Sequence, residues 1–276
     1  MASSQCYRDA PILLNLERRE DASFHLASTW CNLGLWPRET FAEACRELAL
    51  QLGRAVGLHA SDVVLDVGVG YGDQCALWAS EFGVDRVIAV ELSAPLAAAA
   101  AARLQHLERS EVHTASATEL PPPVVAAASG CDVVLCLDCA YHFDTRRHFV
   151  RHAAELLRRG GRFGAVDMLP CDVGWGWRWV AQRVVAAACN IPRANLCGVE
   201  EYRETLHRAG LEVTALTSLS ARVFAPFAAN ATRQRRRLAG QLRWPEWVFL
   251  CSISFIMDRI ARHRLFDAIL VTAEKR

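Results

Sequence analysis

The sequence predicts an α/β fold with a doubly wound, mostly parallel β-sheet, and three features of the chain support this prediction. Short β-branched apolar runs alternate with segments of helical periodicity, which is the pattern of β-α-β units. A glycine-rich turn at 68–72 lies between the first apolar run and the helical segment that follows it. The run at 132–137 is almost wholly apolar, as in a strand that is buried on both faces.

Each element of the first half of the chain has its own sequence signal. The strands are short runs of valine, isoleucine and leucine, which favour extended structure. The helices show apolar residues at helical spacing or, in one case, a run of alanines, the strongest helix former. In chain order we expect a helix at 39–57, a strand at 62–67, a helix at 73–82, a strand at 87–91, a helix at 97–104 and a weak strand at 111–114.

In the second half of the chain, prolines and glycines mark the ends of the elements. Three consecutive prolines at 121–123 interrupt the chain, and Gly160-Gly161 ends a helix. Pro192 and Gly210 end two further helical segments. In chain order we expect a strand at 132–137, a helix at 147–158, a strand at 162–167, helices at 180–188 and 200–209, a strand at 211–219, a largely helical region at 224–264 and a final strand at 266–273.

The composition excludes several classes of function. The formal net charge is +1, which gives no reason to expect nucleic-acid binding. Lys275 is the only lysine, and its place near the C-terminus excludes a P-loop lysine or a Schiff-base lysine. Many of the eleven cysteines lie in apolar runs and no signal peptide precedes them, so we expect reduced thiols in a cytoplasmic protein.

The glycine turn and a nearby acid predict a nucleoside-binding site. Gly68, Gly70 and Gly72 allow a sharp bend and let a ligand approach the peptide planes. Glu91 closes the next strand, where a carboxylate reaches a pair of ribose hydroxyls. The alternative is a tight turn that binds nothing.

Two cofactors use such an arrangement, a dinucleotide and S-adenosylmethionine. A dinucleotide site reads G-x-G-x-x-G, whereas here the glycines fall as G-x-G-x-G and Asp73 takes the place of the third one. No Arg or Lys occurs at 61–80 to neutralise a pyrophosphate. S-adenosylmethionine has no phosphate and carries an ammonium and a sulfonium, so Asp66 and Asp73 favour it.

The glycine string at 64–72 resembles the first motif of the class I S-adenosylmethionine-dependent methyltransferases, and 87–91 resembles the second. The likeness covers roughly residues 55–173. It implies a Rossmann-like, seven-stranded sheet whose last strand runs antiparallel, with N-terminal and C-terminal helical lid insertions. It also implies a single domain over 1–276, with a helical cap at 1–60, a cofactor-binding core at 61–170, and lid helices and last strands at 171–276.

The resemblance assigns roles to individual residues. The three glycines would border the methionine and ribose parts of S-adenosylmethionine, and Glu91 would hold the ribose hydroxyls. Leu92 would lie beside the adenine. Ser116, followed by Ala117, stands where many relatives have an aspartate for the adenine amino group. Trp36, at the end of the segment 30–36, would close over the cofactor.

The residues after the fourth strand are expected to face the transferred methyl group. They resemble the Tyr-His-Phe variant found in small-molecule methyltransferases of the ubiquinone, sterol and tocopherol type. Asp138 would border the cofactor, and Tyr141 and His142 are the candidate catalytic residues. A histidine accepts a proton near neutral pH. Alternatively, His142 caps the following helix or packs on its neighbours.

Cys136 and Cys139 have the spacing of a redox or metal-binding C-x-x-C motif. A redox motif normally begins a helix, whereas Cys136 ends a strand. A metal site needs a fourth ligand in register, and none is evident. We therefore expect neither redox chemistry nor a metal site here.

Aromatic residues outside the predicted sheet indicate the class of acceptor. Trp175, Trp177 and Trp179 alternate after the fifth strand, in a place where the resemblance puts a lid. An aromatic lid favours a small, apolar or amphipathic acceptor; the alternative is ordinary helix packing. The helices at 180–188 and 247–257 also suit a peripheral contact with a membrane surface.

The function we expect is methyl transfer from S-adenosylmethionine to a small molecule. Nucleic-acid methylation is disfavoured by the neutral charge and by the sequence at 138–141. Two alternatives stay open. The first is a nicotinamide-dependent oxidoreductase, and the second is a catalytically inactive methyltransferase-fold binding protein.

Overall fold

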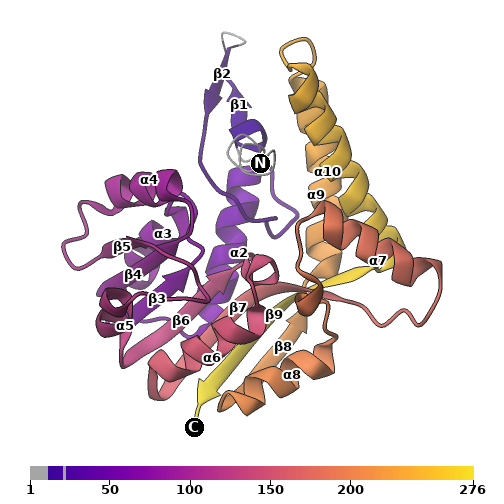
Figure 1. The fold of residues 1–276 in the computed structure, drawn as a ribbon. Coiled ribbons are helices and arrows are strands. Elements are labelled where there is room, and N and C mark those ends of the chain that lie inside the picture. Colours follow the sequence, from indigo (N-terminus) through magenta and orange to yellow (C-terminus); the bar gives the residue numbers. More distant parts are fainter. Residues whose placement is uncertain (1–11, 21–22) are drawn as a thin grey trace. The chain divides into compact units, whose positions relative to one another are not determined.

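The computed structural model describes residues 12–20 and 23–276 (Figure 1). The chain divides into two compact units. The helical unit comprises Met1–Leu48 and Ser220–Arg264, and the sheet unit comprises Ala49–Leu219 and Leu265–Arg276. The expected single domain with its three parts stays a prediction, and each unit is described by itself.

The sheet unit is built on seven strands in the order β5-β4-β3-β6-β7-β9-β8. The neighbours from β5 to β7 pair in parallel, whereas β9 runs antiparallel to both β7 and β8. This confirms the predicted doubly wound, mostly parallel sheet. The strands are β3 (Val63–Val67), β4 (Arg86–Glu91), β5 (Glu111–Thr114), β6 (Cys131–Leu137), β7 (Leu157–Pro170), β8 (Leu211–Ser218) and β9 (Phe266–Lys275).

Six α-helices and two short 3₁₀ helices lie within this unit. Buried residues of α5, α6 and α8, such as Val124, Phe149 and Leu206, share one core with the strands. The C-terminal turns of α2 (Phe41–Val56) approach α3, where a Cβ on Gly53 would lie 2.5 Å from the Phe82 ring. The helices are α3 (Asp73–Phe82), α4 (Ala94–Leu104), α5 (Pro122–Ala128), η1 (Ala140–His142), α6 (Arg146–Leu156), α7 (Trp177–Ala188), η2 (Arg193–Asn195) and α8 (Val199–Arg208).

Two expectations about chain breaks were wrong. The prolines at 121–123 do not simply interrupt the chain, because α5 begins at Pro122, where a missing N–H costs nothing in the first helical turn. Gly160-Gly161 does not end a helix either. Helix α6 ends at Leu156, and both glycines lie within β7, at an irregularity in its pairing with β6. A glycine inside a strand commonly marks such a bulge.

The helical unit contains a pair of packed helices, α9 (Ser220–Arg237) and α10 (Trp244–His263), which lie side by side in Figure 1. The hydroxyl oxygens of Thr232 and Ser254 lie 2.6 Å apart between them. A short hairpin, β1 (Leu16–Arg18) with β2 (Phe24–Leu26), also belongs to this unit and was not predicted. In the described part of the chain, no helix combines the length and the apolar character needed to cross a bilayer.

Candidate active site

The glycine loop after β3 adopts a backbone that few residues other than glycine can take. Gly68, Gly70 and Gly72 have φ angles of 76°, 58° and 81°. The loop is tied to β4, since the N–H of Gly68 donates to the carbonyl of Val90 at 2.8 Å. A Cβ on Gly68 would lie 2.4 Å from Sγ of Cys139. The loop therefore packs directly on the segment that follows β6.

Glu91, at the end of β4, is joined to this loop. Its Oε2 accepts a hydrogen bond from the N–H of Gly70 at 2.9 Å, and its Oε1 accepts one from the N–H of Ser93 at 2.9 Å. Each carboxylate oxygen keeps a second lone pair with which it can accept a hydroxyl proton. The next residue, Leu92, is 73% exposed and places an apolar side chain beside the acid.

Asp66 lies beneath the loop and is fully buried. Its carboxylate accepts hydrogen bonds from Nε1 of Trp78 at 2.7 Å and from the side-chain amide of Gln74 at 2.9 Å, both on α3. Burial raises the pKa of Asp66 to about 6, although these donors oppose the rise. At pH 7 the group is mostly ionised, and its hydrogen bonds join the end of β3 to α3.

A cation that the sequence did not reveal reaches the loop from α4. Arg103 donates through Nε to the carbonyl of Tyr71 at 3.0 Å, and it pairs with Asp73 at 3.4 Å. Arg103 lies 32 residues from Tyr71 along the chain, far outside the segment 61–80. Arg103 is brought in by the helix crossover, and its charge is balanced by Asp73.

The loop after β5 lies beside Glu91. The N–H of Ala115 donates to the carbonyl of Glu91 at 3.0 Å, which brings Ser116 and Ala117 near the end of β4. The Ser116 hydroxyl lies 3.0 Å from that of Thr118 and accepts from the Thr118 N–H. Ala117 is buried. This part of the predicted site is thus gathered at the same edge of the sheet as the glycine loop.

Asp138 and Tyr141 are joined by a side-chain hydrogen bond in the turn that follows β6. Asp138 has φ 58°, a conformation that is uncommon for a residue other than glycine and that is often found at functional sites. Its N–H donates to the carbonyl of Val166 at 2.8 Å. The phenol of Tyr141 donates to Oδ1 of Asp138 at 3.1 Å.

His142 completes the η1 turn. Its Nδ1 lies 3.4 Å from the carbonyl of Asn190, and burial lowers its pKa to about 4. The ring is therefore neutral at pH 7, and a proton on Nδ1 leaves Nε2 as the proton-accepting nitrogen. The cap of the following helix is Thr145, whose hydroxyl accepts from the N–H of His148 at 3.4 Å.

Cys136 and Cys139 lie with their Sγ atoms 3.1 Å apart. Their mutual hydrogen bond and burial raise the pKa of Cys139 well above that of an ordinary thiol, and burial also raises that of Cys136. Both sulfurs therefore stay protonated near pH 7. No group of three or more His, Cys, Asp and Glu side chains among the described residues is arranged to hold a metal ion.

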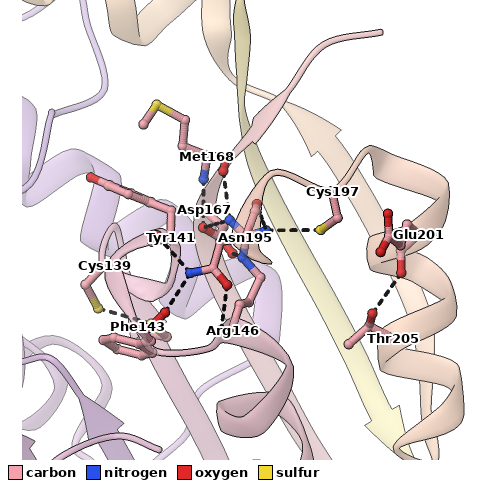
Figure 2. Close-up of polar contacts among 11 residues, drawn as sticks. Cys139, Tyr141, Phe143, Arg146, Asp167, Met168, Asn195, Cys197, Glu201 and Thr205 are labelled. Atoms are coloured by element: carbon pink, nitrogen blue, oxygen red, sulfur yellow. Dashed lines mark hydrogen bonds and ion pairs between the residues drawn. The ribbon is translucent and has the colours of Figure 1, made fainter. Parts of the chain in front are cut away.

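A buried polar network behind the η1 turn was missed by the sequence analysis (Figure 2). Its centre is Arg146, which is 2% exposed and whose Nε lies 2.8 Å from Oδ2 of Asp167. Asn195, which is 1% exposed, joins the turn to Arg146. The sequence carried one weak signal, the aspartate Asp167 at the end of the strand expected at 162–167.

Trp36 belongs to the helical unit. It is 2% exposed, and its indole N–H donates to the carbonyl of Leu33 at 3.1 Å. Nε of Arg222 on α9 donates to the carbonyl of Trp36 at 2.8 Å. Its expected contact with a cofactor stays a prediction.

The chain is similar to known methyltransferases in sequence. A family model described as a methyltransferase domain matches residues 64–161. Erythromycin 3''-O-methyltransferase of Saccharopolyspora erythraea is 31% identical over 219 residues, which are 75% of this chain and 70% of that protein. The 27-O-demethylrifamycin SV methyltransferase of Amycolatopsis mediterranei is 30% identical over 192 residues, which are 68% of each chain.

Solved structures share the fold at lower identity. The [4+2]-cyclase SpnF superposes with a TM-score of 0.71 and 18% identity, over 99% of this chain and 94% of that one. Geranyl diphosphate C-methyltransferase from Streptomyces coelicolor A3(2) gives a TM-score of 0.70 and 16% identity, over 99% of both chains. Because a cyclase and a methyltransferase share this fold, the fold alone does not specify the chemistry.

Proposed function

This chain belongs to the class I S-adenosylmethionine-dependent methyltransferases, and its acceptor is a small molecule. We propose that it methylates a hydroxyl oxygen of that molecule. The observation that carries this proposal is the naming of two curated relatives, at 31% and 30% identity, for methylation at a 3''-oxygen and at a 27-oxygen. The proposed acceptor is a hydroxyl-bearing compound of the erythromycin and rifamycin kind. The comparisons favour neither an oxidoreductase nor an inactive binding protein.

The residues around the glycine loop fit S-adenosylmethionine. Gly68, Gly70 and Gly72 bring main-chain atoms without side chains to the loop, and Glu91 is bonded to the loop through Oε2 and to Ser93 through Oε1. The acidic groups Asp66, Asp73 and Glu91 suit an ammonium and a sulfonium better than a pyrophosphate. The basic group that approaches the loop, Arg103, already pairs with Asp73. These observations support this cofactor over a dinucleotide.

We assign the cofactor contacts by position. The three glycines would border the methionine and ribose, Glu91 would accept from the ribose hydroxyls, and Leu92 with the Ser116-Ala117 loop would border the adenine. Asp138 would lie toward the reacting end, and Trp36 would close over the cofactor. When bound, S-adenosylmethionine supplies a methyl group that its sulfonium makes electrophilic.

We assign to His142 the role of the base that takes the proton of the acceptor hydroxyl. A hydroxyl oxygen that gains a methyl group must lose its proton, and Nε2 of a neutral imidazole can take it. The contact between Nδ1 and the Asn190 carbonyl favours the tautomer with Nε2 as acceptor. Tyr141, held by Asp138, would orient the acceptor hydroxyl.

The experiment is a transfer assay with S-adenosylmethionine that carries a ¹³C-labelled methyl group. The acceptors are O-demethylated erythromycin and rifamycin compounds, beside matched amine and carbon nucleophiles. We expect the label in an O-methyl ether, identified by NMR, and a much lower yield with His142→Gln. Label that enters only amines or carbon atoms would refute the oxygen assignment.

We also propose that the two units act as one methyltransferase domain over 1–276, with the cap, core and lid segments given above. We propose that the enzyme works in the cytoplasm. The ten cysteines among the described residues are thiols that form no disulfide, which supports a reducing compartment. Limited proteolysis tests the domain proposal, because one cooperative domain loses both units together.

The end of α9 and the beginning of α10, which the connection 238–243 joins, support a peripheral contact with an anionic membrane. Trp244 is 74% exposed and stacks on Trp247 at 5.4 Å, and Arg235 lies 5.5 Å from the Trp247 ring. Exposed tryptophans beside arginines suit the lipid–water interface. Co-sedimentation should then be stronger with phosphatidylserine vesicles than with phosphatidylcholine vesicles, and Trp244→Ser should weaken it. Equal recovery with both vesicles would contradict this contact.

A further inference from the structure

We propose that Asn195 is a positioning residue for His142, because its side-chain amide clasps the turn that carries the histidine. Nδ2 of Asn195 donates to the carbonyl of Tyr141 at 3.0 Å and to the carbonyl of Phe143 at 2.7 Å. These are the residues on either side of His142. Figure 2 shows the amide lying between the two carbonyls.

The amide of Asn195 is itself fixed by Arg146. Oδ1 of Asn195 accepts from the main-chain N–H of Arg146 at 2.9 Å, and its main-chain carbonyl accepts from the Arg146 guanidinium at 3.0 Å. Both donors and the acceptor of the amide are thus engaged in a buried place. An amide offers two donors and an acceptor on one planar group, whereas a carboxylate offers only acceptors.

The guanidinium of Arg146 connects this clasp to the sheet. It pairs with Asp167 near the end of β7 and donates to the carbonyl of Met168 at 2.9 Å. It also donates to Sγ of Cys197 at 3.3 Å and lies 5.3 Å from the ring of Tyr202 on α8. The planar, five-donor guanidinium can make these contacts together, which a lysine could not. Arg146 thereby fixes the position of the η1 turn relative to β7 through Asn195.

The same segment of chain also contacts the histidine ring. Asn190, a few residues before Asn195, offers its carbonyl to Nδ1 of His142. The segment from Asn190 to Asn195 therefore sets both the main chain around His142 and the tautomer of its ring. Loss of the hydrogen bonds from Asn195 should make the turn more mobile, so that Nε2 of His142 no longer keeps one orientation.

This inference deepens the proposed function and rests on it where turnover is concerned. The glycine loop and Glu91 follow other strands, β3 and β4, and share no hydrogen bond with Asn195 among the contacts above. Asn195 should therefore affect turnover rather than cofactor binding. A misplacement of a catalytic group by about 1 Å can lower the rate about a hundredfold.

The test compares Asn195→Ala with a matched control, Gln182→Ala. Gln182 is also a buried amide whose nitrogen bridges two main-chain carbonyls, those of Cys171 and Leu265, each at 2.7 Å. Four quantities are measured for both variants. They are the melting temperature, the dissociation constant for S-adenosylmethionine, kcat in the transfer assay with labelled S-adenosylmethionine, and the tautomer of His142 from long-range ¹H–¹⁵N NMR.

We expect Asn195→Ala to lower kcat about tenfold to a hundredfold, with the dissociation constant nearly unchanged and the Nδ1–H tautomer of His142 lost. Gln182→Ala should lower the melting temperature similarly and keep the tautomer of His142. If Asn195→Ala does not fold, Asn195→Asp keeps the size and the bond to Arg146 but loses both donors, and the same losses are expected. Wild-type kcat and an unchanged tautomer in a folded Asn195 variant would overturn the proposal.

The NMR measurement separates this proposal from the proposed function. If His142→Gln retains full turnover, the role of His142 as a base fails. Loss of the His142 tautomer in Asn195→Ala would still support the clasp in that case. An intact tautomer with reduced turnover would instead overturn the positioning role.

Discussion

The main-chain N–H of Gly70 donates to Oε2 of Glu91 at 2.9 Å, so the glycine loop and the acid of the next strand form one structure. The second oxygen of Glu91 is held in the same way by Ser93. A carboxylate that is fixed at both oxygens has little freedom left to lose when it accepts hydroxyl groups. Glu91 is therefore placed to bind a ribose with a small loss of entropy.

Replacing Glu91 with glutamine should weaken binding of S-adenosylmethionine. The charge-assisted hydrogen bonds that are lost correspond to about 1–3 kcal/mol. Titration calorimetry at one ionic strength measures the change. Glu155→Gln, which removes the same charge from an exposed site on α6, serves as the control and should bind as the wild type does. Equal affinities for the two variants would remove Glu91 from the cofactor site.

Replacing His142 with glutamine should lower kcat about a hundredfold, the low end for loss of a general base, and leave cofactor affinity intact. A base acts in its neutral form, and burial lowers the pKa of His142 to about 4. The kcat of the wild type should therefore stay level from neutral pH down to about pH 5, and fall as the pH drops through about 4. A fall centred at the ordinary histidine value would contradict the lowered pKa of the half-buried ring.

Replacing Asp66 with asparagine should change how stability depends on pH. Burial raises the pKa of Asp66 from 3.8 to about 6, so the folded state holds this proton more tightly than the unfolded state. The stabilising contribution is complete below pH 3.8 and is lost as the pH rises through about 6, a change of about 3 kcal/mol.

Urea unfolding of wild type and Asp66→Asn across this range measures the effect. The stability of the wild type relative to the variant should fall as the pH rises. Taking the difference between the two proteins cancels the other titrating groups, including His142. A difference that stays constant with pH would show that Asp66 has an ordinary pKa.

Replacing Gly68 with alanine should cost more stability than replacing Gly130. Both glycines have nearly the same φ, 76° and 77°, so the backbone strain is matched. A Cβ on Gly68 would lie 2.4 Å from Sγ of Cys139, whereas nothing lies within 4 Å of one on Gly130. Gly130→Ala should cost about 1 kcal/mol.

The additional loss in Gly68→Ala should be partly recovered by adding Cys139→Ala, which removes the sulfur. Chemical unfolding of the four proteins gives this coupling as a double-mutant cycle. Strictly additive effects would mean that the loop does not pack on Cys139.

The fold could largely be predicted because its signals are local. The strands β3, β4 and β6 are apolar runs, and α3 follows the glycine turn at the residue expected. The errors occur where local signals are ambiguous. Prolines both break a chain and begin a helix such as α5, and the three-residue strands β1 and β2 are too short to show a period.

The site could be predicted only in part. Glu91 and the glycines carry a motif, because a ligand approaches the backbone and needs residues at fixed places along the chain. Arg103 and Asn195 reach the site through tertiary contacts from distant segments, and nothing in their own neighbourhoods marks them. Hydrogen bonds of this kind can be recognised only in the folded structure, where segments far apart in the sequence lie together.

The most direct test of the cofactor site is a crystal structure of the protein with S-adenosylhomocysteine, the product that the reaction leaves. We expect the nucleoside across the ends of β3 and β4, with its ribose hydroxyls hydrogen-bonded to the carboxylate of Glu91 and its adenine against Leu92. A nucleoside bound elsewhere, or a Glu91 carboxylate with no contact to the sugar, would contradict this expectation.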